Sequence, residues 1–222
     1  MKPTLKVTGR GRLSLTPDMI RIRIEQTDTD PDYSKVIRES TAHTEELRTE
    51  LTALGFDEKA LKTLNFNVST EYEGYQDSDM LWKQRFKGYT VRHSMKVEFS
   101  RDDELMAKVL YRISCLSGKP EFHIEYTVRD TEEAKKNLLE KAVQDAREKA
   151  EILAKASKTA LLQILSIDYS FGDLSFSVQP VNRFTGAKMA VAEEDAMDFS
   201  VEPENIDVTD TVTITWQIQS QE

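Results

Sequence analysis

The clearest fold information in this chain lies in the stretch Ile206-Asp207-Val208-Thr209-Asp210-Thr211-Val212-Thr213-Ile214-Thr215-Trp216-Gln217-Ile218. Large apolar side chains alternate there with threonine and other polar residues. Successive side chains of a strand point to opposite faces, so this alternation predicts a strand with one buried and one exposed face. Strands that helices cover on both sides are apolar throughout, so the pattern favours an antiparallel or mixed sheet.

The same alternation marks four earlier segments of the chain, 20–24, 64–68, 89–99 and 122–128. In each segment most apolar side chains fall on one side of the predicted strand and most polar side chains fall on the other. We therefore expect sheets that bury a single face.

Three segments have the spacing of amphipathic helices instead. The first follows Asp30-Pro31, an N-cap residue with proline at the first helical position, and we expect Gly55 to end it. The second begins after Ser100, with acidic residues near its positive end, and we expect it to end at Gly118-Lys119-Pro120.

The third predicted helix begins at a capping box formed by Asp130 and Glu133. Small residues dominate its apolar stripe, which consists of Ala134, Leu138, Ala142, Ala146, Ala150, Leu153 and Ser157. Small side chains let a helix backbone approach its neighbour closely. We expect this helix to lie flat on a sheet or against a copy of itself.

One-sided strands and three helices together predict an α+β fold, with antiparallel or mixed sheets and the helices packed on one sheet face. We expect a single domain over residues 1–222. The polar segment 73–79 is predicted to be the loop of a hairpin.

A long loop is predicted at about 172–205. Its scattered apolar residues, Met189, Val191, Met197 and Phe199, indicate that it docks on another surface, such as a neighbouring subunit. A mobile surface loop is the alternative interpretation.

The 222-residue chain has a formal net charge of −9. This acidic excess argues against general nucleic-acid binding, which needs a cationic surface against phosphate. No apolar run approaches the ~20 residues of a membrane-spanning helix. The single cysteine, Cys115, excludes a disulfide within the chain and a cysteine-based zinc cluster. The sequence opens without an apolar secretory signal, so we expect a cytoplasmic protein.

Two segments with chemistry-bearing residues have a structural interpretation that we favour. Gly9-Arg10-Gly11 lacks the third glycine and the following helix of a dinucleotide-binding loop, so it predicts a strand bend or bulge. His93 falls on the apolar face of its strand, and no acidic residue shares that strand face. We expect a core histidine with a backbone partner rather than a catalytic base.

Other chemistry-bearing residues also favour structural roles. His123 and Glu125 share a polar strand face without a third metal ligand, which predicts a solvated pair. Cys115 is expected to be a small buried residue. The acidic cluster 102–104 fits a helix start, and the cluster 193–195 fits a solvated loop. We therefore expect no catalytic, cofactor-binding or metal-binding residues.

Short motifs follow one another in a recognisable order along nearly the whole chain. The first are Val7-Thr8-Gly9-Arg10-Gly11, Pro17-Asp18, Gly55-Phe56, Tyr72 and Gly88-Tyr89. The later ones are Ala142, Ala146, Lys149-Ala150, Leu153-Ala154, Met189-Ala190, Pro203, Ile206 and Val208. In this order and spacing the chain resembles the SIMPL-domain proteins, which include bacterial periplasmic immunogenic proteins.

The resemblance implies an α+β fold and a tendency to self-assemble, and it carries no catalytic residue to this chain. The chain departs from the family pattern at two points. Family members often begin with a signal peptide and lie in the cell envelope, whereas this sequence shows no such peptide. Their last strand commonly follows Pro-Gly, whereas here Pro203 precedes Glu204.

We expect a non-enzymatic, self-associating protein without cofactors, in a scaffolding or stress-related role. Candidate contact surfaces are the strand edges, the alanine-lined helix, the 172–205 loop and the threonine face with Thr211, Thr213 and Thr215. The alternative is a small-ligand-binding module with the 172–205 loop as its lid. A third hypothesis is a hydrolase that uses His93 or an acidic cluster, which requires polar groups to converge in space.

Overall fold

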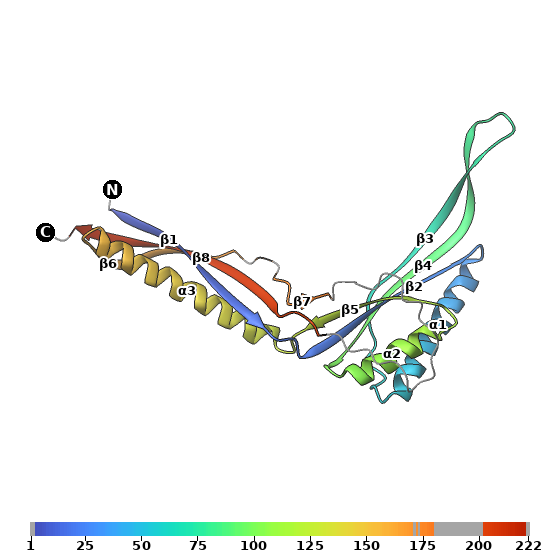
Figure 1. Cartoon of the computed structure of the whole chain (residues 1–222). Helices are drawn as coiled ribbons and strands as arrows, with labels where there is room; N and C mark the ends of the chain where they lie inside the picture. The colour runs from blue at the N-terminus through green and yellow to red at the C-terminus, as the bar shows by residue number, and fades with distance from the viewer. Residues whose placement is uncertain (1–2, 171, 173, 180–201, 221–222) are drawn as a thin grey trace. The chain divides into compact units, whose positions relative to one another are not determined.

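The computed structural model describes residues 3–170, 172, 174–179 and 202–220. Within these residues it contains three helices and two antiparallel sheets, which confirms the α+β fold (Figure 1). In chain order the elements are β1 (Thr4–Leu15), β2 (Met19–Asp30), α1 (Tyr33–Ala53), β3 (Lys62–Gln76), β4 (Trp82–Ser100), α2 (Asp103–Ser114), β5 (Glu121–Thr127), α3 (Thr131–Ala156), β6 (Thr159–Asp168), β7 (Ser177–Val178) and β8 (Ile206–Ser220).

The chain divides into two compact units. Unit 1 comprises Met1–Asp18, Thr127–Val178 and Glu204–Glu222, and unit 2 comprises Met19–Tyr126 and Gln179–Pro203. Compactness does not measure whether each unit folds independently, so one domain over residues 1–222 stays a prediction.

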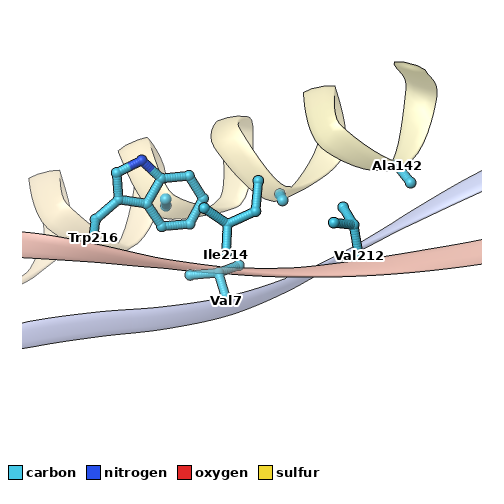
Figure 2. Packing of buried hydrophobic residues seen from close by; sticks show 7 residues of the cluster. Val7, Ala142, Val212, Ile214 and Trp216 are labelled. Carbon is cyan, nitrogen blue, oxygen red and sulfur yellow. The ribbon is translucent and has the colours of Figure 1, made fainter. Parts of the chain in front are cut away.

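Unit 1 contains a three-stranded sheet in the order β1-β8-β6, with α3 against it. The register of β1 against β8 is continuous from Thr4↔Gln217 to Leu15↔Ile206. The predicted apolar face of β8 is buried, and Figure 2 shows its side chains between the strands and α3. Asp210 also lies on this face, where its carboxylate accepts a 2.8 Å hydrogen bond from the Tyr169 hydroxyl.

Helix α3 lies on the sheet, which is the first of the two arrangements that its small residues allowed. Its N-cap is Asp130, whose side chain accepts from the backbone N–H of Glu133 as predicted. The buried stripe ends at Ala154, whereas Leu153 and Ser157 are exposed, so the prediction was wrong at these two positions. The stripe continues at i+4 from Ala150, which places position 154 rather than 153 toward the sheet.

Gly9 and Gly11 let β1 touch the backbone of α3. A Cβ at Gly9 would lie 2.0 Å from the carbonyl oxygen of Ala142, and one at Gly11 would lie 2.0 Å from that of Leu138. The strand bend or bulge predicted here is wrong, because the β1–β8 register continues through both glycines. Close approach of a helix, rather than an irregular strand, explains these glycines.

Unit 2 contains the strand order β3-β4-β2-β5, with α1 against β2 and β4 and with α2 against α1. Ile20, Ile22 and Ile24 of β2 are fully buried, as their alternation predicted. The N-cap of α1 is Asp32 and not Asp30, because Asp32 accepts from the backbone N–H of Lys35.

The expected stop of the first helix and the expected start of the second helix are confirmed. Gly55 follows α1 with a φ of +90°, the left-handed conformation that glycine adopts easily. Asp102 caps α2 by accepting from the backbone N–H of Leu105. Helix α2 ends at Ser114, earlier than predicted.

The β3–β4 hairpin is longer than the sequence pattern predicted. Residues 73–76 belong to β3 rather than to a loop, and the turn spans only residues 77–81. Beyond Asp30↔Tyr89, β4 has no β2 partner, so the hairpin continues as two strands (Figure 1). Cross-strand pairs such as Tyr72–Phe86 stabilise this part, although its side chains are polar or half-exposed.

Residues 174–178 of the predicted 172–205 loop pack within unit 1. Phe176 is buried in a cluster with Leu138, Ile206 and Val208, and its carbonyl oxygen accepts from the Thr127 hydroxyl at 2.8 Å. The segment also forms the short strand β7. The apolar residues Met189, Val191, Met197 and Phe199 and the acidic cluster 193–195 lie outside the described residues.

Candidate functional site

His93 lies in a polar cluster of unit 2 that forms where α1 covers the sheet. Its Nδ1 is 3.1 Å from the Thr44 hydroxyl, and its Nε2 is 2.9 Å from the Thr63 hydroxyl. The Thr44 hydroxyl donates its proton to the carbonyl of Ser40, so Nδ1 donates to Thr44, and Nε2 of the neutral imidazole accepts from Thr63. Both partners are hydroxyls, so the predicted backbone partner is wrong.

The cluster keeps His93 neutral. The imidazole is 7% exposed, and the Phe66 ring packs edge-on against it at 5.2 Å between centroids. Burial lowers the pKa of His93, against the weaker attraction of Asp28 and Glu25. Both ring nitrogens are thus engaged in hydrogen bonds within unit 2.

The native state should therefore lose stability on acidification through His93. Because its pKa is lower in the folded state, the unfolded chain takes up the proton first as the pH falls below ~6.5. The free energy of unfolding should fall there by at most about 1.4 kcal/mol per pH unit. Urea unfolding at several pH values measures this slope. The His93→Gln variant should show a smaller slope, and an unchanged slope would contradict the assignment.

A carboxylate reaches the same region from the neighbouring strand. Asp28 of β2 is buried, and its Oδ1 lies 2.8 Å from His43 Nδ1 and 3.1 Å from Gln26 Nε2. No acidic residue shares the face of His93 along its own strand, and only strand pairing brings this acid close. Register pairs Gln26 with His93, which places Asp28 two residues further along the same face.

The geometry of this cluster does not favour the hydrolase hypothesis. His93 is bonded to two hydroxyls instead of to an acid and a nucleophile. His43 is paired with Asp28, but no hydroxyl or thiol in the described ranges lies within hydrogen-bond distance of His43 Nε2. Nucleophilic catalysis needs the nucleophile, base and orienting acid in one hydrogen-bonded chain.

Glu125 is not the solvated residue that the sequence predicted. Its carboxylate is buried and pairs with Arg23 Nε at 2.9 Å and with Arg21 Nη1 at 3.3 Å. Its strand neighbour His123 is exposed. Two guanidinium groups occupy the acceptor oxygens of Glu125, so a metal cation would meet positive charge there. In the part of the chain that the structure describes, no three potential metal ligands form a cluster.

Cys115 is exposed, so the prediction of a buried small residue is wrong. It is the C-cap residue of α2, while Ile113 and Leu116 take the buried positions. Two residues along a helix correspond to about 200° of rotation, which turns position 115 away from the core. The acidic cluster 102–104 has its predicted place, with Asp102 as N-cap and Asp103 and Glu104 in the first turn of α2.

The most distinctive surface of unit 1 lies on β6. Four of its large apolar side chains are exposed, and we call them the β6 surface: Leu162, Ile164, Leu165 and Ile167. Ile164 pairs in register with Trp216 and Ile167 pairs with Ile214, both buried residues of β8. Ile164 and Ile167 nevertheless remain 51% and 56% exposed. The core between α3 and the sheet is therefore open on its β6 side.

The outer edges of β1 and β6 differ in whether their backbone groups have hydrogen-bond partners. At β1, α3 satisfies the edge, because Asp145 accepts from the backbone N–H of Arg10 at 2.6 Å and Lys149 donates to the carbonyl of Thr8. At β6, no further strand pairs with the outer edge within the described residues. An open edge next to exposed apolar side chains is a surface that a second polypeptide can complete.

None of the helices in the described ranges combines the length and apolar character needed to cross a membrane.

Comparison with known proteins places the chain in one family. The family model called SIMPL, described as a protein of unknown function (DUF541), matches residues 5–216. None of the curated proteins compared with the chain matches it. The matched residues include β1 from Leu5, all of α3 and β6, and β8 as far as Trp216, so the family pattern includes most of the core of unit 1. The chain therefore belongs to the SIMPL family, whose function is unknown.

Proposed function

We propose that this protein is a non-enzymatic, self-associating protein whose copies meet at the β6 surface. The observation that carries the proposal is the half-exposed pair Ile164 and Ile167, which continue the buried core of Trp216 and Ile214 into solvent. Burial of such side chains in a second copy removes apolar area from water, at about 25 cal/mol per Å². Interfaces of lasting dimers resemble a protein core cut in two.

Charge supports contact at β6 rather than elsewhere. Two copies that each carry −9 repel one another over most of their surfaces. From Thr159 to Ile167, β6 contains no charged residue, and Lys158 and Asp168 flank this neutral stretch. Copies can therefore approach there without the cost of like charges in contact.

A two-fold arrangement of two β6 strands also matches these flanking charges. Lys158 and Asp168 are equally distant in sequence from Gln163, so antiparallel pairing centred on Gln163 sets Lys158 of one copy opposite Asp168 of the other. Register shifts between Leu161 and Ser166 interrupt a regular ladder. We therefore expect buried side chains to contribute more stability than continuous backbone hydrogen bonds.

Light scattering on the full chain at several concentrations tests the proposal. The native protein should show a mass above that of one chain at high concentration. The Ile164→Asp/Ile167→Asp variant should raise the dissociation constant at least about tenfold, because it places two carboxylates in the interface. Met80→Asp/Leu81→Asp is the matched control, since it adds the same charges to exposed apolar residues of the β3–β4 turn.

Three outcomes would contradict the proposal. A strictly monomeric native chain would remove self-association itself. If the Ile164→Asp/Ile167→Asp variant assembled as well as the native chain, the β6 surface would not be the interface. The same conclusion would follow if only the control variant disrupted assembly. The pairing geometry has its own check, because Lys158→Asp should weaken assembly and Lys158→Asp/Asp168→Lys should restore it.

The ligand-binding alternative, with the 172–205 loop as lid, receives less support. Residues 174–178 of that loop pack within unit 1 around Phe176, and most of the loop lies outside the described residues. A scaffolding or stress-related role and a cytoplasmic location stay predictions.

A further inference from the structure

A groove in unit 1 gathers positive charge on an acidic protein. It has a volume of about 530 Å³ and lies between β1 and one side of α3. Strand β1 contributes Thr8, Arg10 and Arg12, and α3 contributes Lys141, Asp145 and Lys149. Four cations and one carboxylate give these residues a formal charge of +3. Since the chain totals −9, all its other residues together carry −12.

The only acidic side chain of the groove is already engaged. Asp145 Oδ2 accepts from Lys149 Nζ at 2.6 Å and from the backbone N–H of Arg10 at 2.6 Å. The hydrogen bond from Lys149 has the larger effect and that from the Arg10 backbone the smaller, and both lower the pKa of Asp145 and keep its carboxylate ionised. Asp145 thus neutralises Lys149 while it joins α3 to the edge of β1.

The other three cations have no carboxylate partner of this kind. Arg10, Arg12 and Lys141 are exposed, and no carboxylate in the described ranges lies within ion-pair distance of them. Arg10 and Arg12 share one face of β1, about 7 Å apart along the strand. Lys141 and Lys149 are two turns apart on α3, a rise of about 12 Å.

We propose that this groove binds a small polyanion that carries at least two phosphate groups. Guanidinium forks match phosphate oxygens in pairs, and two of them at strand spacing favour neighbouring phosphates over a single one. Lys141 adds a third charge from the opposite wall, and Thr8 and Thr211 also line the groove. Long nucleic acids fit poorly, because the remaining −12 repels a polymer that extends past the groove.

Calorimetric titration of the full chain with inorganic tripolyphosphate at low salt tests this inference. Saturable binding is expected, with affinity that falls as salt rises. The Arg10→Gln/Arg12→Gln variant should bind at least about tenfold more weakly, because charge-assisted hydrogen bonds are lost. Lys141→Gln, on the other wall, should also weaken binding. Orthophosphate should bind more weakly than tripolyphosphate, and a long oligonucleotide should gain no affinity over it.

The matched control is Arg38→Gln/Lys59→Gln, which removes two exposed cations of unit 2 and leaves the groove intact. It should bind tripolyphosphate like the native chain. If the control and Arg10→Gln/Arg12→Gln weakened tripolyphosphate binding equally, net charge alone would explain the effect, and the proposed site would be wrong. If tripolyphosphate showed no saturable binding, the proposed site would be wrong, and these cations would serve only to protect the β1 edge. The Ile164→Asp/Ile167→Asp variant should retain binding, so the groove and the β6 surface can fail independently.

Discussion

Replacement of Gly9 by alanine is expected to lower the free energy of unfolding by about 3 kcal/mol, a large effect for a single methyl group. The added Cβ would lie 2.0 Å from the carbonyl oxygen of Ala142 and 2.4 Å from the backbone nitrogen of Ala146. These are backbone atoms, so no side-chain rotation relieves the overlap. Helix α3 must move away from β1, which opens the core that contains Trp216.

Denaturant unfolding followed by tryptophan fluorescence measures this effect. Trp216 lies in the affected core, and Trp82→Phe removes the exposed second tryptophan from the signal. Gly172→Ala is the matched control, since a Cβ there meets no atom within 4 Å. If Gly9→Ala were as stable as Gly172→Ala, the contact between β1 and α3 would be wrong.

Replacement of Arg21 by methionine should cost about 2–3 kcal/mol, because it leaves the buried Glu125 carboxylate with a single cation. Arg21 contacts Glu125 at 3.3 Å and Glu98 at 2.5 Å. Glu98 retains Lys96, whereas Glu125 retains only Arg23, whose side chain is 45% exposed. Denaturant unfolding of the full chain, followed by circular dichroism, measures the loss.

A double variant separates two contributions to this loss of stability, the unpaired buried carboxylate and the missing packing of the arginine side chain. Arg21→Met/Glu125→Met should recover most of the lost stability, since exchange of a whole buried ion pair for apolar side chains is often neutral. Lys96→Met is the control, because it removes a cation from the partly exposed Glu98, which keeps Arg21, and it should cost less than about 1 kcal/mol. A double variant no more stable than Arg21→Met would show that packing, rather than the unpaired carboxylate, accounts for the loss.

Much of the fold was predictable because its signals are local. Alternation in β2, β4 and β8 reflects the geometry of a single strand, and the small stripe of α3 reflects the geometry of a single helix. The N-cap residues Asp102 and Asp130 were predictable for the same reason, because a cap bonds within its own first turn. The hairpin was underpredicted, since residues 73–76 are polar yet paired across the strands.

The chemistry of individual side chains was less predictable. Glu125 was expected in water and Cys115 in the core, and the structure reverses both. Arg21 and Arg23 lie about a hundred positions from Glu125 in sequence, and only strand order brings them together. His93 was correctly placed on the buried face of its strand, but its hydrogen-bond partners Thr44 and Thr63 come from two other elements.

By itself the sequence determined which faces of the strands and helices are apolar, because that information resides in the order of neighbouring residues. It also determined the family, whose pattern spans residues 5–216. Only the tertiary structure decided that Gly9 and Gly11 contact the backbone of α3. It also decided that Ile164 and Ile167 stay exposed to solvent. It alone set Arg10 and Arg12 across a groove from Lys141. These features depend on distances between residues far apart in the chain, and such distances exist only after the elements have packed.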